Sequence, residues 1–494
     1  MFNYRLQILQ ITFSILSLFC FSCFYACKPK SVSDPVKQSE KFAPPEATPV
    51  PEGTPSELGL AAYAKVLCSA IFVSDREPEE AFANSGYFMM PEEDQGNIEY
   101  TIDYDDKSVV LTLRDSIQRR AWYVGDQGCI IMRDGLHFEP RKVETTLPDA
   151  ELQDWPMGDR NNNQAWAPEI DTTLLREAVE LAFSPPEALT AAFLVIYNGN
   201  IIAERYAPGI DKDTQLESWS MGKSLTATFI GRMIQIGYFN LDDPAPVEAW
   251  QQKGDPRADI RIRDLLQMSS GLRFTAHRDP EADQYTRSLD HMYIYTGAIN
   301  AFEYSINRPL QFPVGKEGRY RNCDPLTLGY IMRTTLEKNG EDYLSFGQRE
   351  LFDKIGIRKQ VMETDPFGNF LLTGYDYGTA RNWGRLGLLY LRDGVWNDER
   401  LLPEGWSEFV STKAPAWKEP VYGGLFWLNG NDEFPLPKST YYMAGAGGQR
   451  TIIVPEMDLV IIRMGHFRGA ETGMKSLNKA IEKLVAVLKV IRPK

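Results

Sequence analysis

The segment between residues 220 and 236 is predicted to form a helix that is apolar on nearly every side. Its large apolar residues are Leu225, Phe229, Ile230, Met233 and Ile234. A helix without a polar face is buried in a large core, so the chain must pack several layers around it. Ser220 opens this helix, and Lys223 follows one turn later. Because positions i and i+3 share a face, the Lys223 ammonium can reach the Ser220 hydroxyl.

Ser220 and Lys223 together resemble a nucleophile with its own base. Burial in an apolar helix disfavours the charged ammonium, so it would lower the pKa of Lys223 and let the amine accept the Ser220 proton. The serine would then attack a carbonyl and form an acyl-enzyme. A Ser-x-x-Lys match alone also fits a serine that caps its helix beside a solvated lysine. Further motifs are needed to choose between these interpretations.

Two later motifs favour catalysis. Tyr320 and Asn322 form a Tyr-x-Asn after a loop that contains Pro and Gly, and a glycine-rich stretch lies at 445–449. In this order, the Ser-x-x-Lys, the Tyr-x-Asn and the glycine strand resemble the serine β-lactamase superfamily. The closest branch is the class C-like serine hydrolases of the 6-aminohexanoate-dimer hydrolase type. The resemblance covers about residues 167–494.

The resemblance implies a role for each matching residue. Ser220 would be the nucleophile, with Lys223 as its partner and Tyr320 sharing the proton transfer. The backbone N–H groups of Ser220 and Ala446 would form the oxyanion hole. The residues that would orient the substrate are Asn322, Gly445 and Gly447. No metal or other cofactor is implied, and the partner would be a small-molecule amide or ester.

The glycine strand departs from the penicillin-recognising members of this superfamily. Those members carry Lys or His, then Thr or Ser, before the glycine, and this cation and hydroxyl hold a substrate carboxylate. Here residues 442–444 are Tyr, Met and Ala. Linear amides and esters are therefore better candidate substrates than β-lactams. A carboxylesterase or D-aminopeptidase on the same scaffold is an alternative, and a non-catalytic penicillin-binding-like envelope protein is an alternative of another class.

The hydrophobic pattern predicts an α/β (α+β) fold with one antiparallel sheet flanked by helices. Asn198-Gly199, between two strand-like runs, is a strong hairpin signal. A second hairpin is predicted at 451–463, and the stretch between the two hairpins is mostly helical. The resemblance implies that this stretch includes an all-helical subdomain.

The composition divides the chain into five parts. Residues 1–27 read as a signal or lipoprotein leader with Cys27 as the lipidated residue, and an uncleaved membrane span is the alternative. Residues 28–58 form a Pro-rich tether, 59–147 a small α+β unit without a chemical motif, 148–166 a linker and 167–494 the hydrolase domain. We expect an exported protein of the cell envelope, held at the membrane by its N-terminal anchor, on the periplasmic or outer surface.

Cysteine usage and charge add two expectations. Cys68 and Cys129 are predicted to form a disulfide, because an exported protein meets an oxidising compartment; two buried thiols are the alternative. Cys323 has no partner left. The net charge of −14 repels phosphate backbones, so nucleic-acid binding is not expected.

Histidines and aromatic residues give weaker signals. His277 and His291 fall in a polar loop, and no spacing supports a Ser-His-Asp triad. Tyr375, Tyr377 and Trp427 could line an acyl pocket, but plain packing explains such residues more simply.

Overall fold

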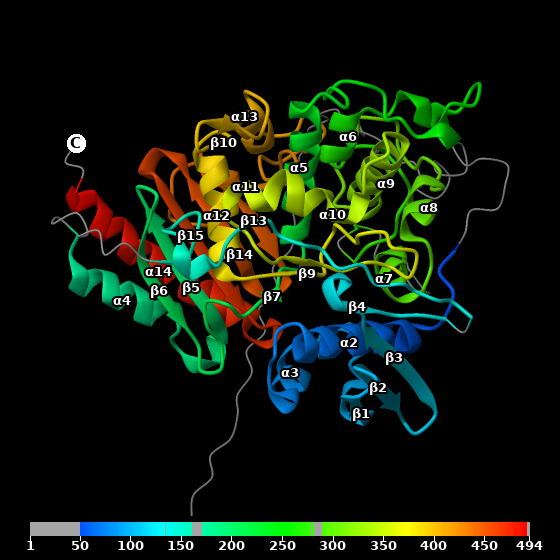
Figure 1. Ribbon diagram of the computed structural model, residues 1–494, viewed down its shortest axis with the longest axis horizontal. Helices are drawn as coiled ribbons and strands as arrows, with labels where there is room; N and C mark the ends of the chain where they lie inside the picture. Colours follow the sequence, from blue (N-terminus) through cyan, green and yellow to red (C-terminus); the bar gives the residue numbers. More distant parts are fainter. Residues whose placement is uncertain (1–49, 134, 161–169, 278, 281–288, 492–494) are drawn as a thin grey trace, which may run out of the picture.

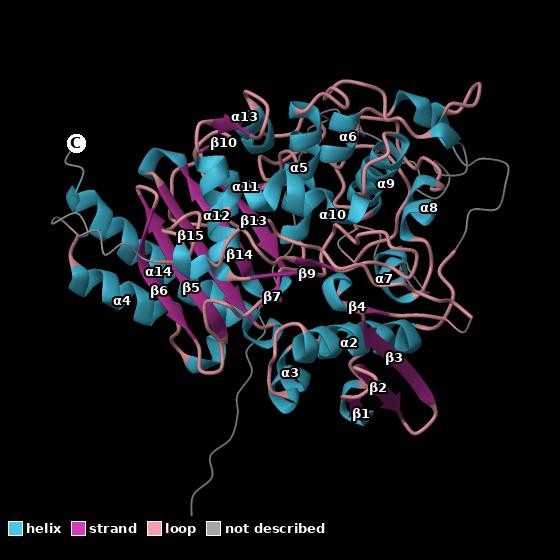
Figure 2. Cartoon of the chain, in the orientation of Figure 1, coloured by secondary structure: helices cyan, strands magenta, loops and turns pink. Residues whose placement is uncertain are grey.

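The structure is a computed structural model that describes residues 50–133, 135–160, 170–277, 279–280 and 289–491. The predicted leader, including Cys27, and nearly all of the predicted tether lie outside these residues. Within the described ranges, no helix is both long and apolar enough to cross a bilayer. Figures 1 and 2 show a large body built on one sheet, with a smaller unit packed against it.

The smaller part, called the N-terminal unit, spans residues 55–130. Its elements are α2 (Pro55–Phe72), α3 (Pro78–Asn84), β1 (Ile98–Asp103), β2 (Ser108–Leu113), β3 (Ile117–Tyr123) and β4 (Cys129–Ile130). The antiparallel strands follow the order β1-β2-β3-β4, and α2 packs on β2 and β3. A disulfide joins Cys68 of α2 to Cys129 of β4, while Cys323 is free and buried.

The N-terminal unit begins earlier than the sequence pattern indicated. Helix α2 starts at Pro55, inside the predicted tether, because Thr54 and Glu57 form a capping box and proline suits the first helical position. Strand β3 carries no apolar run, since one of its faces is polar and exposed. This strand was therefore not predicted from the sequence.

The large body is built on a six-stranded sheet in the order β12-β13-β14-β15-β5-β6, with every neighbouring pair antiparallel. Its strands are β5 (Thr190–Tyr197), β6 (Asn200–Tyr206), β12 (Trp427–Leu428), β13 (Tyr441–Gly445), β14 (Gln449–Val454) and β15 (Leu459–Gly465). Both predicted hairpins form, and β15 pairs with β5 to join them into one sheet. The predicted fold class is confirmed.

Helices cover both faces of this sheet. Alternate residues of β5 point to opposite sides, so Phe193 and Val195 join one core while Leu194 and Ile196 join the other. Helices α4 (Thr172–Ala182) and α14 (Ala470–Ile491) lie together over the first face. Helices α5 (Met221–Gln235) and α12 (Ala380–Leu391) pack on the second. The predicted apolar helix is α5, which is buried over nearly its whole length.

A helical region lies beyond α5. It contains α6 (Ile262–Leu266), α7 (Asp290–Thr296), α8 (Ala301–Ile306), α9 (Cys323–Lys338), α10 (Tyr343–Gly347) and α11 (Asp353–Ile355). The remaining elements are β7 (Leu216–Glu217), β8 (Val361–Met362), β9 (Asp376–Gly378), β10 (Val395–Trp396), β11 (Glu399–Arg400) and α13 (Trp406–Ser411). Strands β7, β9 and β8 form a small sheet, and β7 comes shortly before α5 in the chain.

Candidate active site

Ser220 and Lys223 meet at the start of α5. Ser220 is the N-cap residue, and the Lys223 Nζ donates a hydrogen bond to its Oγ over 3.1 Å. The Lys223 side chain is almost fully buried, and its Nζ also donates to the Thr373 carbonyl at 2.6 Å. Trp219, directly before the serine, has a φ of 49°, so the chain turns sharply into the helix. The buried amine is therefore held against the partly buried hydroxyl.

The beginning of α5 is fixed by a close approach to β9. A Cβ added at Gly222 would lie 2.1 Å from Oδ1 of Asp376, so only glycine fits here. The Ser218 N–H donates to the Asp376 carbonyl, which aligns the turn with the small sheet. Burial raises the pKa of the Asp376 carboxyl to about 7. These contacts set the direction in which the helix leaves Ser220.

Tyr320 lies beside the lysine. The Lys223 Nζ is 4.8 Å from the centroid of the Tyr320 ring, within the range of a cation–π contact. The ring is held from its other sides by Tyr422 and Trp427, whose centroids lie 6.0 and 5.5 Å away. Trp427, named above as a pocket candidate, thus packs against Tyr320. The Tyr320 ring therefore covers one side of the Lys223 amine.

Asn322 is linked to Lys223 by hydrogen bonds that pass through Tyr295 and Thr373. Its buried Nδ2 donates to the Tyr295 Oη at 2.9 Å and lies 3.1 Å from Nδ1 of His291. The Tyr295 hydroxyl also bonds the Thr373 hydroxyl, and the Thr373 carbonyl accepts from Lys223. Asn322 therefore orients two aromatic side chains around the site. Sequence reasoning did not identify Tyr295 or Thr373, because no local spacing marks them.

The glycine-rich strand runs against the turn that carries the serine. Strand β13 ends at Gly445, where an added Cβ would lie 2.1 Å from the Ser218 carbonyl oxygen. Ala446 follows in a tight turn, and Gly447 adopts a φ of 78° that favours glycine. Both Ser220 and Ala446 line one cavity. The structure thus brings together the two residues predicted to supply the oxyanion-hole N–H groups.

Arg463 holds the glycine turn by hydrogen bonds to its carbonyl groups. This fully buried side chain donates to the carbonyls of Gly447 and Gly448, each at 3.0 Å, and to that of Ala188 at 2.8 Å. Burial lowers the pKa of its guanidinium to about 9. Three carbonyls from two chain segments are thereby fixed, which holds the turn in place. No motif or spacing around Arg463 indicated this role.

Adding a methyl group at Gly445 is expected to damage catalysis. In Gly445→Ala the new Cβ must push β13 away from the Ser218 carbonyl, and this moves the Ala446 N–H. Loss of one oxyanion donor costs about 10²–10³ in kcat. Gly96→Ala is the matched control, since a Cβ there meets nothing within 4 Å. Ester hydrolysis at saturating substrate measures the effect; wild-type turnover in Gly445→Ala would remove Ala446 from the proposed oxyanion hole.

A cavity of about 600 Å³ opens in front of Ser220. From the large body it is lined by Trp219, Ser220, His277, Leu289, His291, Met292, Tyr295, Thr373, Gly374, Tyr375 and Ala446. His277 and His291, read from the sequence as part of a polar loop, contribute to its wall. Tyr375 lines the cavity, whereas Tyr377 is buried in β9 and is not among the lining residues. Further lining residues come from the N-terminal unit.

The family of the chain follows from a match to the Beta-lactamase family model over residues 180–486. The chain belongs to the beta-lactamase family. The predicted membership is confirmed, and the matched range holds Ser220, Lys223, Tyr320 and the glycine strand. The N-terminal unit lies outside the match.

Individual relatives agree with this family. The chain is 25% identical over 313 residues to 6-aminohexanoate-dimer hydrolase of Paenarthrobacter ureafaciens, covering 58% of this chain and 77% of that one. It is 21% identical over 324 residues to an uncharacterised protein of Alkalihalophilus pseudofirmus, covering 58% and 87%. A Bacillus anthracis structure, provisionally named a 6-aminohexanoate-dimer hydrolase, superposes with a TM-score of 0.51 at 19% identity, covering 63% and 82%. The first of these relatives supports a hydrolase, and the Bacillus anthracis structure shows that the fold is shared.

Proposed function

We propose that this protein is a serine hydrolase that cleaves a linear amide or ester through an acyl-enzyme. The observation that carries the proposal is the 3.1 Å hydrogen bond between the buried Lys223 amine and the Ser220 hydroxyl, at the edge of a cavity. A serine is a weak nucleophile until a neighbouring base takes its proton. Lys223 is the base within hydrogen-bond reach.

The proposed reaction has two halves. Lys223, as the neutral amine, takes the Ser220 proton while Oγ attacks the substrate carbonyl, and the N–H groups of Ser220 and Ala446 bind the resulting oxyanion. The proton then passes to the leaving group, with Tyr320 sharing the transfer, and the acyl-enzyme forms. Lys223 then takes a proton from water as the water oxygen adds to the acyl carbonyl, the Ser220–acyl bond breaks, and this proton passes to Ser220 Oγ while the acid product leaves. No cofactor takes part in these steps.

The substrate class follows from two lines of support. The similarity to 6-aminohexanoate-dimer hydrolase favours a linear amide. The absence of a cation at residues 442–444 of the glycine strand disfavours β-lactams, which carry a carboxylate. A carboxylesterase is the second candidate, and the largely apolar cavity in front of Ser220 favours it.

A panel of linear amides, small esters, D-amino-acid amides and one β-lactam on a single purified sample tests this proposal. We expect turnover of amides or esters to exceed that of the β-lactam at least about tenfold in kcat/KM. Preferential hydrolysis of the β-lactam would contradict the proposed substrate class. A complete lack of turnover would favour the non-catalytic binding protein.

We further propose that the protein acts in the cell envelope, attached to the membrane by its N-terminus. The apolar leader with Cys27 supports this location. The disulfide between Cys68 and Cys129 is also consistent with it, since such bonds persist in oxidising compartments. Fractionation of the producing cells tests the proposal, and a protein confined to the reducing cytosol would contradict it.

A further inference from the structure

The N-terminal unit contributes to the cavity in front of Ser220, although it lies outside the family match. The residues concerned are Pro55, Leu58, Phe88, Met89, Met90 and Pro91. We infer that this unit is a wall of the active site that selects a substrate with an uncharged, apolar group next to the scissile bond. The inference rests on the proposed serine hydrolase and specifies its substrate class.

The wall touches the residue next to the nucleophile. The Phe88 ring meets the Trp219 ring edge to face, with centroids 5.3 Å apart, and Trp219 directly precedes Ser220. Phe88 also stacks on Phe467, which follows the end of β15. The side chain is thus held between two parts of the large body. A change at Phe88 alters the cavity beside the reacting atoms.

Two glycines let the wall approach α2 closely. The turn Tyr87–Met89 is pressed onto this helix, since a Cβ at Gly59 would lie 2.5 Å from the Met89 carbonyl oxygen. A Cβ at Gly86 would lie 2.2 Å from the ring of Tyr63. Met89 and its neighbours are therefore placed by backbone packing and not by a free loop. A binding wall needs this kind of fixed position.

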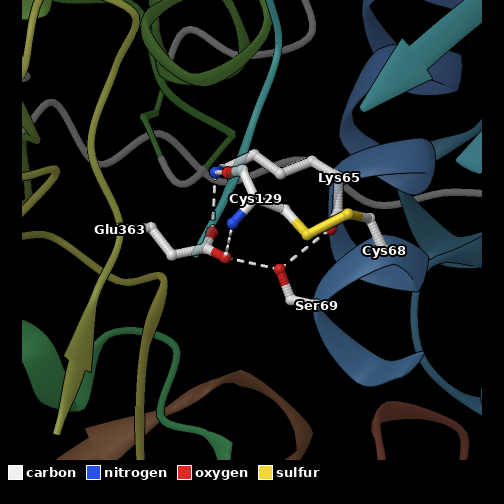
Figure 3. The surroundings of a disulfide bond; sticks show 5 residues. All are labelled: Lys65, Cys68, Ser69, Cys129 and Glu363. Atoms are coloured by element: carbon white, nitrogen blue, oxygen red, sulfur yellow. Dashed lines mark hydrogen bonds and ion pairs between the residues drawn. A yellow bond between two sulfur atoms is a disulfide. The ribbon is translucent and has the colours of Figure 1, made fainter. Parts of the chain in front are cut away.

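Buried polar contacts fix the unit to the large body (Figure 3). Lys65 of α2 and Glu363 form an ion pair at 2.6 Å with both side chains fully buried. Glu363 also accepts from the Ser69 hydroxyl and from the Cys129 N–H, next to the disulfide. The Lys65 Nζ lies 5.1 Å from the ring centroid of Tyr375, which lines the cavity. Separating the unit would leave a buried charge unpaired, so the wall is a permanent part of the site.

The chemistry of the lining determines what can bind. Among the described residues that line the cavity there is no Lys, Arg, Asp or Glu. Burial lowers the pKa of His277, which favours the neutral imidazole. Among these described residues a substrate ammonium or carboxylate would lose hydration without meeting an oppositely charged Lys, Arg, Asp or Glu, whereas a hydrocarbon chain gains by leaving water. A linear substrate with charged ends would have to keep them outside.

Chain-length preference tests the wall by kinetics. Two ester series are compared, p-nitrophenyl acetate against p-nitrophenyl hexanoate and ethyl acetate against hexyl acetate, so that either side of the scissile bond is sampled. We expect kcat/KM to favour the longer chain about tenfold in at least one series. Phe88→Ala and, as a second variant, Met89→Ala should reduce this preference about tenfold. The matched control is Phe367→Ala, which removes an exposed ring that does not line the cavity.

A binding experiment tests the role of the wall even if no ester is hydrolysed. Calorimetry on the full chain compares hexanamide with acetamide and with 6-aminohexanamide, which adds one ammonium to the same chain. We expect hexanamide to bind at least about tenfold more tightly than either, and Phe88→Ala to reduce this difference. Equal affinities, or a preference that both Phe88→Ala and Met89→Ala leave unchanged, would overturn the wall. Lack of turnover with this binding pattern intact would instead refute the proposed hydrolase.

Discussion

Ser220→Ala is expected to lower kcat for the best ester or amide substrate by at least about 10⁴-fold, because no other atom in the site replaces the attacking oxygen. The fold should survive, since the hydrogen bond that the structure gives the Ser220 hydroxyl is the one it accepts from Lys223. Steady-state kinetics and thermal unfolding of the same sample measure the two effects separately.

Ser224→Ala is the matched control in the same helix. The Ser224 hydroxyl is buried and donates to the Leu425 carbonyl at 2.7 Å, so its removal should cost about 1–3 kcal/mol of unfolding free energy. Its turnover should stay close to wild type, because this hydroxyl does not face the cavity. Ser220→Ala with substantial residual turnover would contradict the mechanism, whatever the control shows.

Lys223→Met is expected to lower kcat by about 10²–10⁴-fold, the range that a general base contributes. Methionine fills a similar volume but cannot accept the Ser220 proton, and it leaves the Thr373 carbonyl without its donor. The same kinetic assay, supported by a thermal unfolding curve, separates the catalytic loss from a loss of stability.

Lys223→Arg distinguishes a base from a charge. The guanidinium places a positive charge beside Ser220 and holds its proton much more strongly than an amine does, so this variant should be as inactive as Lys223→Met. Near wild-type turnover in Lys223→Arg would show that only the charge matters. A mild effect of Lys223→Met would move the base to Tyr320, whose ring lies against the lysine.

The parts of the site that the sequence predicted are those set by local geometry. Ser220 and Lys223 lie one helical turn apart, so their contact follows from the pitch of α5 and the apolar character of its residues. The antiparallel sheet was predictable for a similar reason. One hairpin carries the Asn198-Gly199 dipeptide and both contain long apolar runs, which are short-range signals.

The parts that it did not predict depend on contacts between distant segments. Phe88 reaches Trp219, and Asn322 holds Tyr295, only after the chain has folded. The N-terminal unit carries no catalytic motif, because its contribution is a set of apolar side chains whose meaning comes from where they lie. Strand β3 was missed for a different reason: one of its faces is polar and exposed, so the segment contains no apolar run.

The most direct measurement is labelling with a fluorophosphonate, followed by intact mass and peptide mapping. This reagent forms a covalent bond with an activated serine, whereas an ordinary hydroxyl does not react with it. We expect one adduct per chain, on the peptide that contains Ser220, and no adduct in Ser220→Ala. An unlabelled wild-type protein, or an adduct on a different serine, would contradict it.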